Sequence, residues 1–178
     1  IYNLPMYAIV ETIGNSDLFT GRKKLINYLL KWSEDIAEEK SESIALLGKR
    51  RVGKTVVLER IYNILYAKQG NVIPLYYEIE ESKKYLPSFG KEFFCTFVSQ
   101  YLGFKLRNAK YCKLTLELPR IKKICIENNF TDLLEFVEQF EFIFNTGQTE
   151  PVWHFAQAFP HKFGSITGEH FLQIIDEF

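Results

Sequence analysis

The sequence predicts an α/β fold in which a parallel β-sheet is flanked by helices. Three observations predict it. A glycine-rich stretch, residues 48–55, follows a short apolar run, residues 43–47, and precedes a segment with apolar residues at helical spacing, residues 55–68. A second apolar run, residues 72–79, has the near-continuous hydrophobic character of a buried parallel strand. A strand, loop, helix and strand in this order imply a right-handed crossover.

Length and composition narrow the range of functions. The chain has 178 residues, enough for one domain with a single core, and its 22 basic and 22 acidic residues give a net charge of zero. This balance argues against attachment of the whole chain to nucleic acid or to an acidic membrane by charge alone. No apolar run approaches the roughly 18 residues that a membrane-spanning helix needs. We therefore expect no membrane association and a cytoplasmic location.

Cysteine and histidine spacing predicts no transition-metal site. The three cysteines lie far apart, without a C-x-x-C pair, and the three histidines lack the close helical spacing of a metal-binding pair. We expect reduced thiols rather than disulfides.

The segment before the glycine-rich stretch predicts one amphipathic helix, because large apolar residues recur at steps of four, three and four. These residues are Leu25, Leu29, Trp32 and Ile36. We expect residues 1–18 to lie as an extended arm across the domain.

Residues 48–55, Gly-Lys-Arg-Arg-Val-Gly-Lys-Thr, match the phosphate-binding loop G-x-x-x-x-G-K-[ST] at every fixed position. The two glycines allow turns that direct successive backbone N–H groups at phosphate oxygens, and the dipole of the following helix adds to the same field. Lys54 can reach the β- and γ-phosphates, and the Thr55 hydroxyl can bind Mg²⁺. The predicted nucleotide-binding residues of the loop are Gly48, Lys49, Arg50, Arg51, Val52, Gly53, Lys54, Thr55 and Val56.

After the second predicted strand the pattern predicts helices. We expect Ser88 to cap a long helix, Pro119 to begin a short one and Thr131 to cap a third. Pro151 is expected to open a further helix that Pro160 stops.

A compact nucleotide-binding domain needs few elements between the two halves of its site, so we expect residues 105–160 to form a helical insertion within a single domain. Its first part, residues 105–123, is basic and interleaved with apolar residues. Either a nucleic-acid patch or an ordinary solvated face would give this pattern.

The last eight residues predict a strand that ends in two carboxylates, Asp176 and Glu177. This pattern resembles a Walker B element. Asp176 would hold Mg²⁺ together with Thr55, usually through water, and the expected catalytic residues are Glu177, which would polarise the attacking water, and Lys54. The chain ends one residue after Glu177, so we expect a fragment that binds ATP without efficient turnover.

Three blocks, residues 19–22, 48–55 and 174–177, resemble archaeal-type P-loop ATPases of the AAA+/STAND group. The resemblance implies a RecA-like parallel sheet, ATP and Mg²⁺ as ligands, and a lid and winged-helix region further along the chain. It makes Arg22 a candidate nucleotide contact, with a surface arginine as the alternative. A homo-oligomer, and a DNA or protein partner bound through regions outside this chain, are open expectations.

Other nucleotide-binding classes share the loop. A GTPase would ordinarily carry an Asn-Lys-x-Asp element, and the sequence has none. A small-molecule kinase stays a minor alternative. The main rival is a nucleotide-gated scaffold or DNA-binding regulator, in which bound ATP holds one conformation and hydrolysis is slow.

Overall fold

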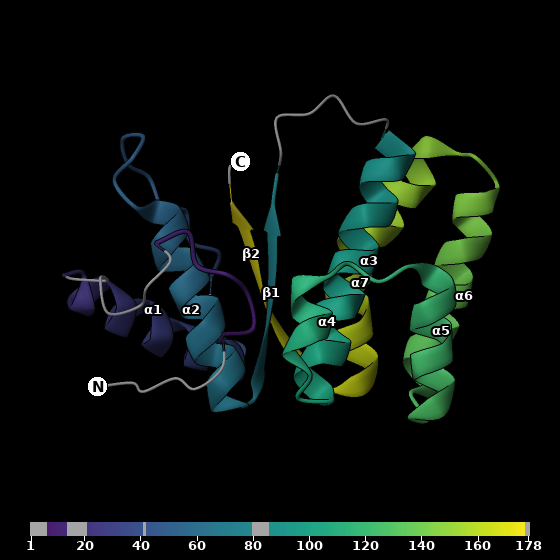
Figure 1. Cartoon of the computed structure of the whole chain (residues 1–178), viewed down its shortest axis with the longest axis horizontal. Helices are drawn as coiled ribbons and strands as arrows, with labels where there is room; N and C mark the ends of the chain where they lie inside the picture. Colours follow the sequence, from purple (N-terminus) through teal and green to yellow (C-terminus); the bar gives the residue numbers. More distant parts are fainter. Residues whose placement is uncertain (1–6, 14–20, 41, 80–85, 177–178) are drawn as a thin grey trace.

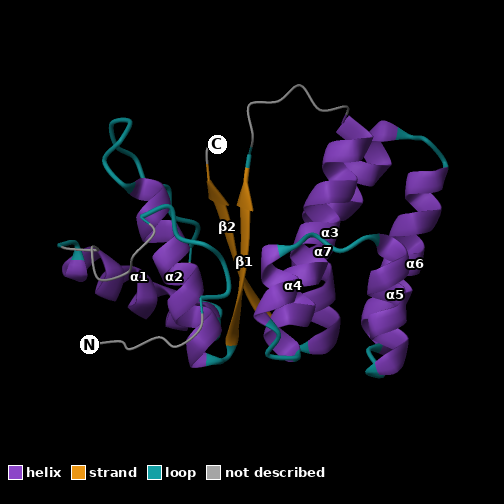
Figure 2. Ribbon diagram, viewed as in Figure 1, coloured by secondary structure: helices purple, strands orange, loops and turns teal. Residues whose placement is uncertain are grey.

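The computed structural model describes residues 7–13, 21–40, 42–79 and 86–176, and within these ranges the chain is mostly helical (Figure 1). Figure 2 shows the two strands between two groups of helices. In chain order the elements are α1 (Lys23–Ile36), α2 (Lys54–Lys68), β1 (Val72–Glu78), α3 (Leu86–Lys105), α4 (Ala109–Lys113), α5 (Leu118–Glu127), α6 (Thr131–Asn145), α7 (Thr149–Thr167) and β2 (His170–Asp176).

Strands β1 and β2 form a parallel pair that joins distant parts of the sequence. The register runs from Val72 opposite His170 to Glu78 opposite Asp176. Beyond the last pair, the N–H of Ile79 donates to the carbonyl oxygen of Asp176 at 3.0 Å. The carboxyl ends of both strands point to the same side of the molecule as the N-terminal end of α2 (Figure 1). In α/β proteins this is the side on which ligands bind.

The predicted multi-strand parallel sheet of a RecA-like or AAA+-like P-loop NTPase is wrong, because the described residues contain a two-strand sheet. Residues 43–47, predicted as a strand before the loop, are irregular and largely exposed, with Leu47 92% exposed. A short apolar run does not specify a strand by itself. A strand also needs a hydrogen-bonded neighbour and burial against other elements, which the local pattern does not encode.

Helices cover both faces of the strand pair. Helices α1 and α2 pack on one face, while α3 packs on β1 and α7 on β2 from the other (Figure 1). Helices α5 and α6 pack against each other and lie outside α3 and α7. The part expected as an insertion, residues 105–160, is therefore helical, and it shares one hydrophobic cluster with the sheet.

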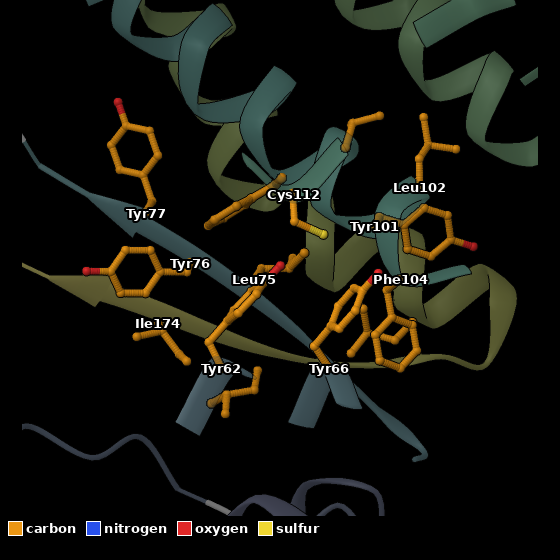
Figure 3. Close-up of a cluster of buried hydrophobic side chains, with 14 of the residues drawn as sticks. Tyr62, Tyr66, Leu75, Tyr76, Tyr77, Tyr101, Leu102, Phe104, Cys112 and Ile174 are labelled. Atoms are coloured by element: carbon orange, nitrogen blue, oxygen red, sulfur yellow. The ribbon is translucent and has the colours of Figure 1, made fainter. Parts of the chain in front are cut away.

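Aromatic side chains fill the space between the sheet and the α3–α7 layer. Tyr77 of β1 lies 4.9 Å, between ring centroids, from Phe93 of α3. Further out, Phe94 of α3 stacks on Phe140 of α6 with centroids 4.0 Å apart and rings 14° from parallel. Figure 3 shows side chains of α2, β1, α3 and α4 in one buried cluster around the sheet. Such rings bury large apolar areas and form the main part of this core.

Several helix boundaries differ from the predictions. Helix α3 begins at Leu86, so Ser88 lies inside its first turn, and Thr131 is the first residue of α6 rather than its cap. Helix α7 continues through Pro160, which was expected to stop it. Phe159 and Phe163 flank this proline and are fully buried, so packing outweighs the one lost backbone hydrogen bond. Helix α5 begins at Leu118, so Pro119 is its second residue rather than its first.

The outer edge of β1 is closed by a side chain. The Gln100 amide of α3 accepts a hydrogen bond from the Tyr76 N–H at 2.7 Å and donates one to the Tyr76 carbonyl at 2.8 Å. Pro74, two residues earlier, faces the same edge and has no N–H to donate. A proline is tolerated within β1 because its missing N–H would face this outer edge and not β2.

None of the helices in the described ranges has both the length and the apolar character needed to cross a membrane.

Candidate phosphate-binding site

The predicted phosphate-binding loop leads directly into α2. Gly53 precedes the helix in the left-handed conformation, with φ 78°, and Arg51 is also left-handed, with φ 63°. Residues in this conformation turn successive N–H groups toward one side, the arrangement that binds anions. The first N–H groups of α2 have no partner within the helix and carry the positive end of its dipole. The backbone here has the features that an anion requires.

The Lys54 side chain folds back over the loop. Its ammonium donates to the carbonyl oxygens of Gly48 at 2.9 Å and Lys49 at 3.2 Å. Gly48 also lies close to the loop's own side chains, since a Cβ on it would be 3.2 Å from Cγ2 of Val52. Lys54 therefore spans the turn from the first helical residue to the start of the motif and holds its positive charge against the loop backbone.

The rest of the loop faces solvent. Lys49, Arg50 and Arg51 are exposed, while Thr55 and Val56 are half-buried in the first turn of α2. Figure 1 shows the loop projecting beyond the N-terminal end of this helix. Three exposed cationic side chains beside the unpaired N–H groups give this end of the molecule a locally positive field, although the whole chain is neutral.

Arg22 lies beside the loop. It precedes α1 in the left-handed conformation, with φ 53°, and its guanidinium donates to the carbonyl oxygen of Val52. It thus contacts the loop backbone, and its expected contact with a nucleotide stays a prediction.

Asp176, the predicted metal ligand, lies at the carboxyl end of β2 and is 6% exposed. The Tyr76 hydroxyl donates to its Oδ2 at 3.1 Å. Burial raises the pKa of Tyr76, and the nearby charges of Asp176 and Glu59 raise it further. Tyr76 therefore keeps its proton and remains a donor to the carboxylate at neutral pH. The predicted base Glu177 lies outside the described residues.

Glu59 is a carboxylate that the sequence analysis did not single out. It lies on α2 one turn after Thr55, on the same face of the helix, and is 6% exposed. Burial raises the pKa of Glu59, hydrogen bonds from Thr12 lower it, and the charges of Glu11 and Asp176 raise it again. The charge of Asp176, at the end of β2, therefore acts on Glu59 of α2.

A sequence signal for Glu59 exists. Helix α2 is buried on nearly all sides, yet its middle carries Glu59, Arg60 and Asn63, all of them buried. Buried charged and amide side chains need specific partners, so polar residues inside an otherwise apolar helix mark contacts that hydrophobic periodicity alone does not reveal.

The donor types at this end of the sheet fit Mg²⁺. Mg²⁺ prefers oxygen ligands, keeps several waters and takes only one or two protein ligands in nucleotide sites. The Thr55 hydroxyl and the Asp176 carboxylate are donors of this kind. In the described part of the chain, no three His, Cys, Asp or Glu side chains gather in a way that could hold a metal by themselves.

Comparison of the chain with protein-family models, with curated proteins and with solved structures found no match. The interpretation of the site therefore depends on its geometry and on the sequence motif.

Proposed function

We propose that this chain binds Mg-ATP through residues 48–55, with Lys54 and the N-terminal N–H groups of α2 on the phosphates. Thr55 and Asp176 would hold the metal, which would neutralise phosphate charge. The single observation that carries the proposal is the Lys54 ammonium folded over the Gly48 and Lys49 carbonyls at a left-handed glycine turn. In a complex, these lysine donors would exchange carbonyl oxygens for phosphate oxygens, which are stronger acceptors.

The resemblance to AAA+/STAND ATPases supports a choice of ATP and of hydrolysis, with Glu177 as the base. ATP as the ligand and hydrolysis with Glu177 as the base are therefore part of our proposal. The multi-strand sheet that the resemblance also implied is not. The nucleotide-gated scaffold is the alternative within the same site, and homo-oligomerisation, a DNA or protein partner and a cytoplasmic location stay predictions.

The binding proposal is tested by calorimetric titration with Mg-ATP. Lys54→Ala should weaken affinity by about tenfold to a hundredfold, because each charge-assisted hydrogen bond lost to a phosphate is worth about 1.5–3 kcal/mol. Lys68→Ala is the matched control, since Lys68 lies on the same helix at its opposite, exposed end. Equal affinity in the Lys54 variant and the wild type would refute the site.

Hydrolysis is tested separately. Glu177→Gln should stop turnover while ATP binding persists, because the amide cannot accept a proton from the attacking water. Unchanged phosphate release in this variant would remove Glu177 from the mechanism. An ATP-dependent output, such as partner binding, that persists in this variant would favour the nucleotide-gated scaffold.

A further inference from the structure

The described N-terminal residues 7–13, which we call the N-terminal strap, lie along α2 (Figure 1). Asn63 of α2 is fully buried and serves as the main anchor. Its Oδ1 accepts hydrogen bonds from the N–H groups of Ala8 at 2.9 Å and Ile9 at 3.0 Å. Its Nδ2 donates to the Ile9 carbonyl and to Glu11, both at 3.1 Å. One side chain thus binds the strap much as a neighbouring strand would.

A second anchor is a buried ion pair. Arg60 of α2 lies 2.8 Å from Oε2 of Glu11, and Glu11 is 4% exposed. The Arg60 guanidinium also lies 6.0 Å from the centre of the Tyr7 ring. Because a buried charge without its partner is strongly unfavourable, these contacts fix the strap to α2 rather than allowing it to slide.

The third anchor joins the strap to the face of α2 that carries Thr55. The Thr12 N–H donates to Oε2 of Glu59 at 2.8 Å, and the Thr12 hydroxyl donates to Oε1 at 2.6 Å. Thr12 is exposed while Glu59 is buried, so Thr12 closes over the carboxylate from outside. Both oxygens of Glu59 therefore have a donor on the strap.

We propose that Thr12 and Glu59 are positioning residues of the nucleotide site, and that docking of the N-terminal strap favours triphosphate binding. This inference rests on the proposed function. A carboxylate one helical turn from Thr55 repels the phosphates, and the two donors from Thr12 offset part of its charge and hold it in place. Without the Thr12 donors, the full negative charge of Glu59 would act on the phosphate-binding end of the helix.

The test is calorimetric titration of the full chain with Mg-ATP. Thr12→Val keeps the shape of the side chain and the backbone N–H but removes the hydroxyl donor. It should weaken ATP binding by about threefold to tenfold. Thr12→Ser keeps the hydroxyl and should bind as the wild type does. Thr146→Val is the matched control, because it removes a hydroxyl donor at the exposed end of α6, away from the loop.

A double variant separates charge from simple loss of packing. If the Glu59 charge is responsible, Thr12→Val combined with Glu59→Gln should regain the affinity of the wild type, because the uncharged amide no longer repels phosphate. A double variant that binds no more tightly than Thr12→Val alone would overturn the inference. So would an unchanged affinity in Thr12→Val while the wild type binds ATP, an outcome that leaves the proposed function intact. Absence of ATP binding by the wild type would instead refute the proposed function, and the inference with it.

Discussion

The two sides of the β1–β2 pair are held together by different forces. On the α3–α7 side, aromatic rings pack face to face or edge to face, as Phe94 does against Phe140 and Phe159. On the α2 side, the N-terminal strap depends on hydrogen bonds and an ion pair made by three polar side chains of one helix. Apolar packing is strong and tolerant of small shifts, whereas buried hydrogen bonds fix positions and are costly to leave incomplete. On the side next to the predicted phosphate loop, hydrogen bonds and an ion pair therefore fix the position of the strap on α2.

The largest effect should come from the aromatic side. Phe94→Ala should lower the free energy of unfolding by about 3–5 kcal/mol, because it leaves a cavity between α3 and α6. Phe142→Ala, on the 73% exposed side chain of the same α6 helix, should change it by less than about 0.5 kcal/mol. Denaturant unfolding measures both. The ATP affinity of the folded Phe94 variant should stay at the wild-type value. A large loss of affinity would show that the aromatic side also supports the nucleotide site.

A smaller and more local effect is expected on the polar side. Asn63→Leu removes the acceptor for the Ala8 and Ile9 N–H groups, which should cost about 2–3 kcal/mol. Amide hydrogen exchange should accelerate at Ala8 and Ile9 while α3 keeps its protection. Asn145→Leu, at the exposed end of α6, is the control. Uniform acceleration across the chain would mean that the strap is part of the global core rather than a separately held segment.

The smallest effect per residue is the pH dependence of the free energy of unfolding that comes from the three buried cysteines on the helical side. Burial raises the pKa of Cys95 to about 12 and that of Cys112 and Cys125 to about 11, from a usual value of 9.0. The unfolded chain therefore loses these protons at lower pH than the folded chain. The stabilisation by the protonated thiols is fully present below pH 9 and is lost as the pH rises toward 11–12.

Between pH 9 and pH 10 each thiol should cost about 1 kcal/mol of stability. Unfolding measured at the two pH values in the wild type and in Cys95→Ala checks this, because the variant should show a loss smaller by about that amount. An equal loss in both proteins would mean that Cys95 does not titrate as its burial implies.

Local pattern predicted part of the fold. The stripe in α1 and the apolar runs of β1 and β2 were recognised because each has a periodicity or composition that its own burial requires. The phosphate-binding loop before α2 was predicted from fixed glycine and lysine positions, and its function stays a prediction. Where the outcome depends on distant residues, local pattern failed. Residues 43–47 have the composition of a strand but are not assigned to one, and Pro160 is accepted inside α7 because of the rings around it.

The site was predicted in the same uneven way. The loop residues and Asp176 could be named because their types and order follow the chemistry of phosphate and Mg²⁺. Glu59 could not, because its hydrogen bonds come from Thr12 and its charge interacts with Asp176, which lie 47 and 117 positions away in the sequence (59 − 12 and 176 − 59). The sequence around a single carboxylate on a helix does not indicate which distant residues it contacts in the fold.

The Gln100 contact with Tyr76 also bears on how the protein avoids aggregation. An open strand edge offers N–H and C=O groups that can recruit a strand from another molecule. At β1 the Gln100 side-chain amide already pairs with the N–H and C=O of Tyr76, and Pro74 on the same edge has no N–H to donate. During synthesis β1 emerges before α3, so this edge stays available for wrong pairing until α3 has docked. Replacement of Gln100 would leave the N–H and C=O of Tyr76 without these two hydrogen bonds in the folded chain as well.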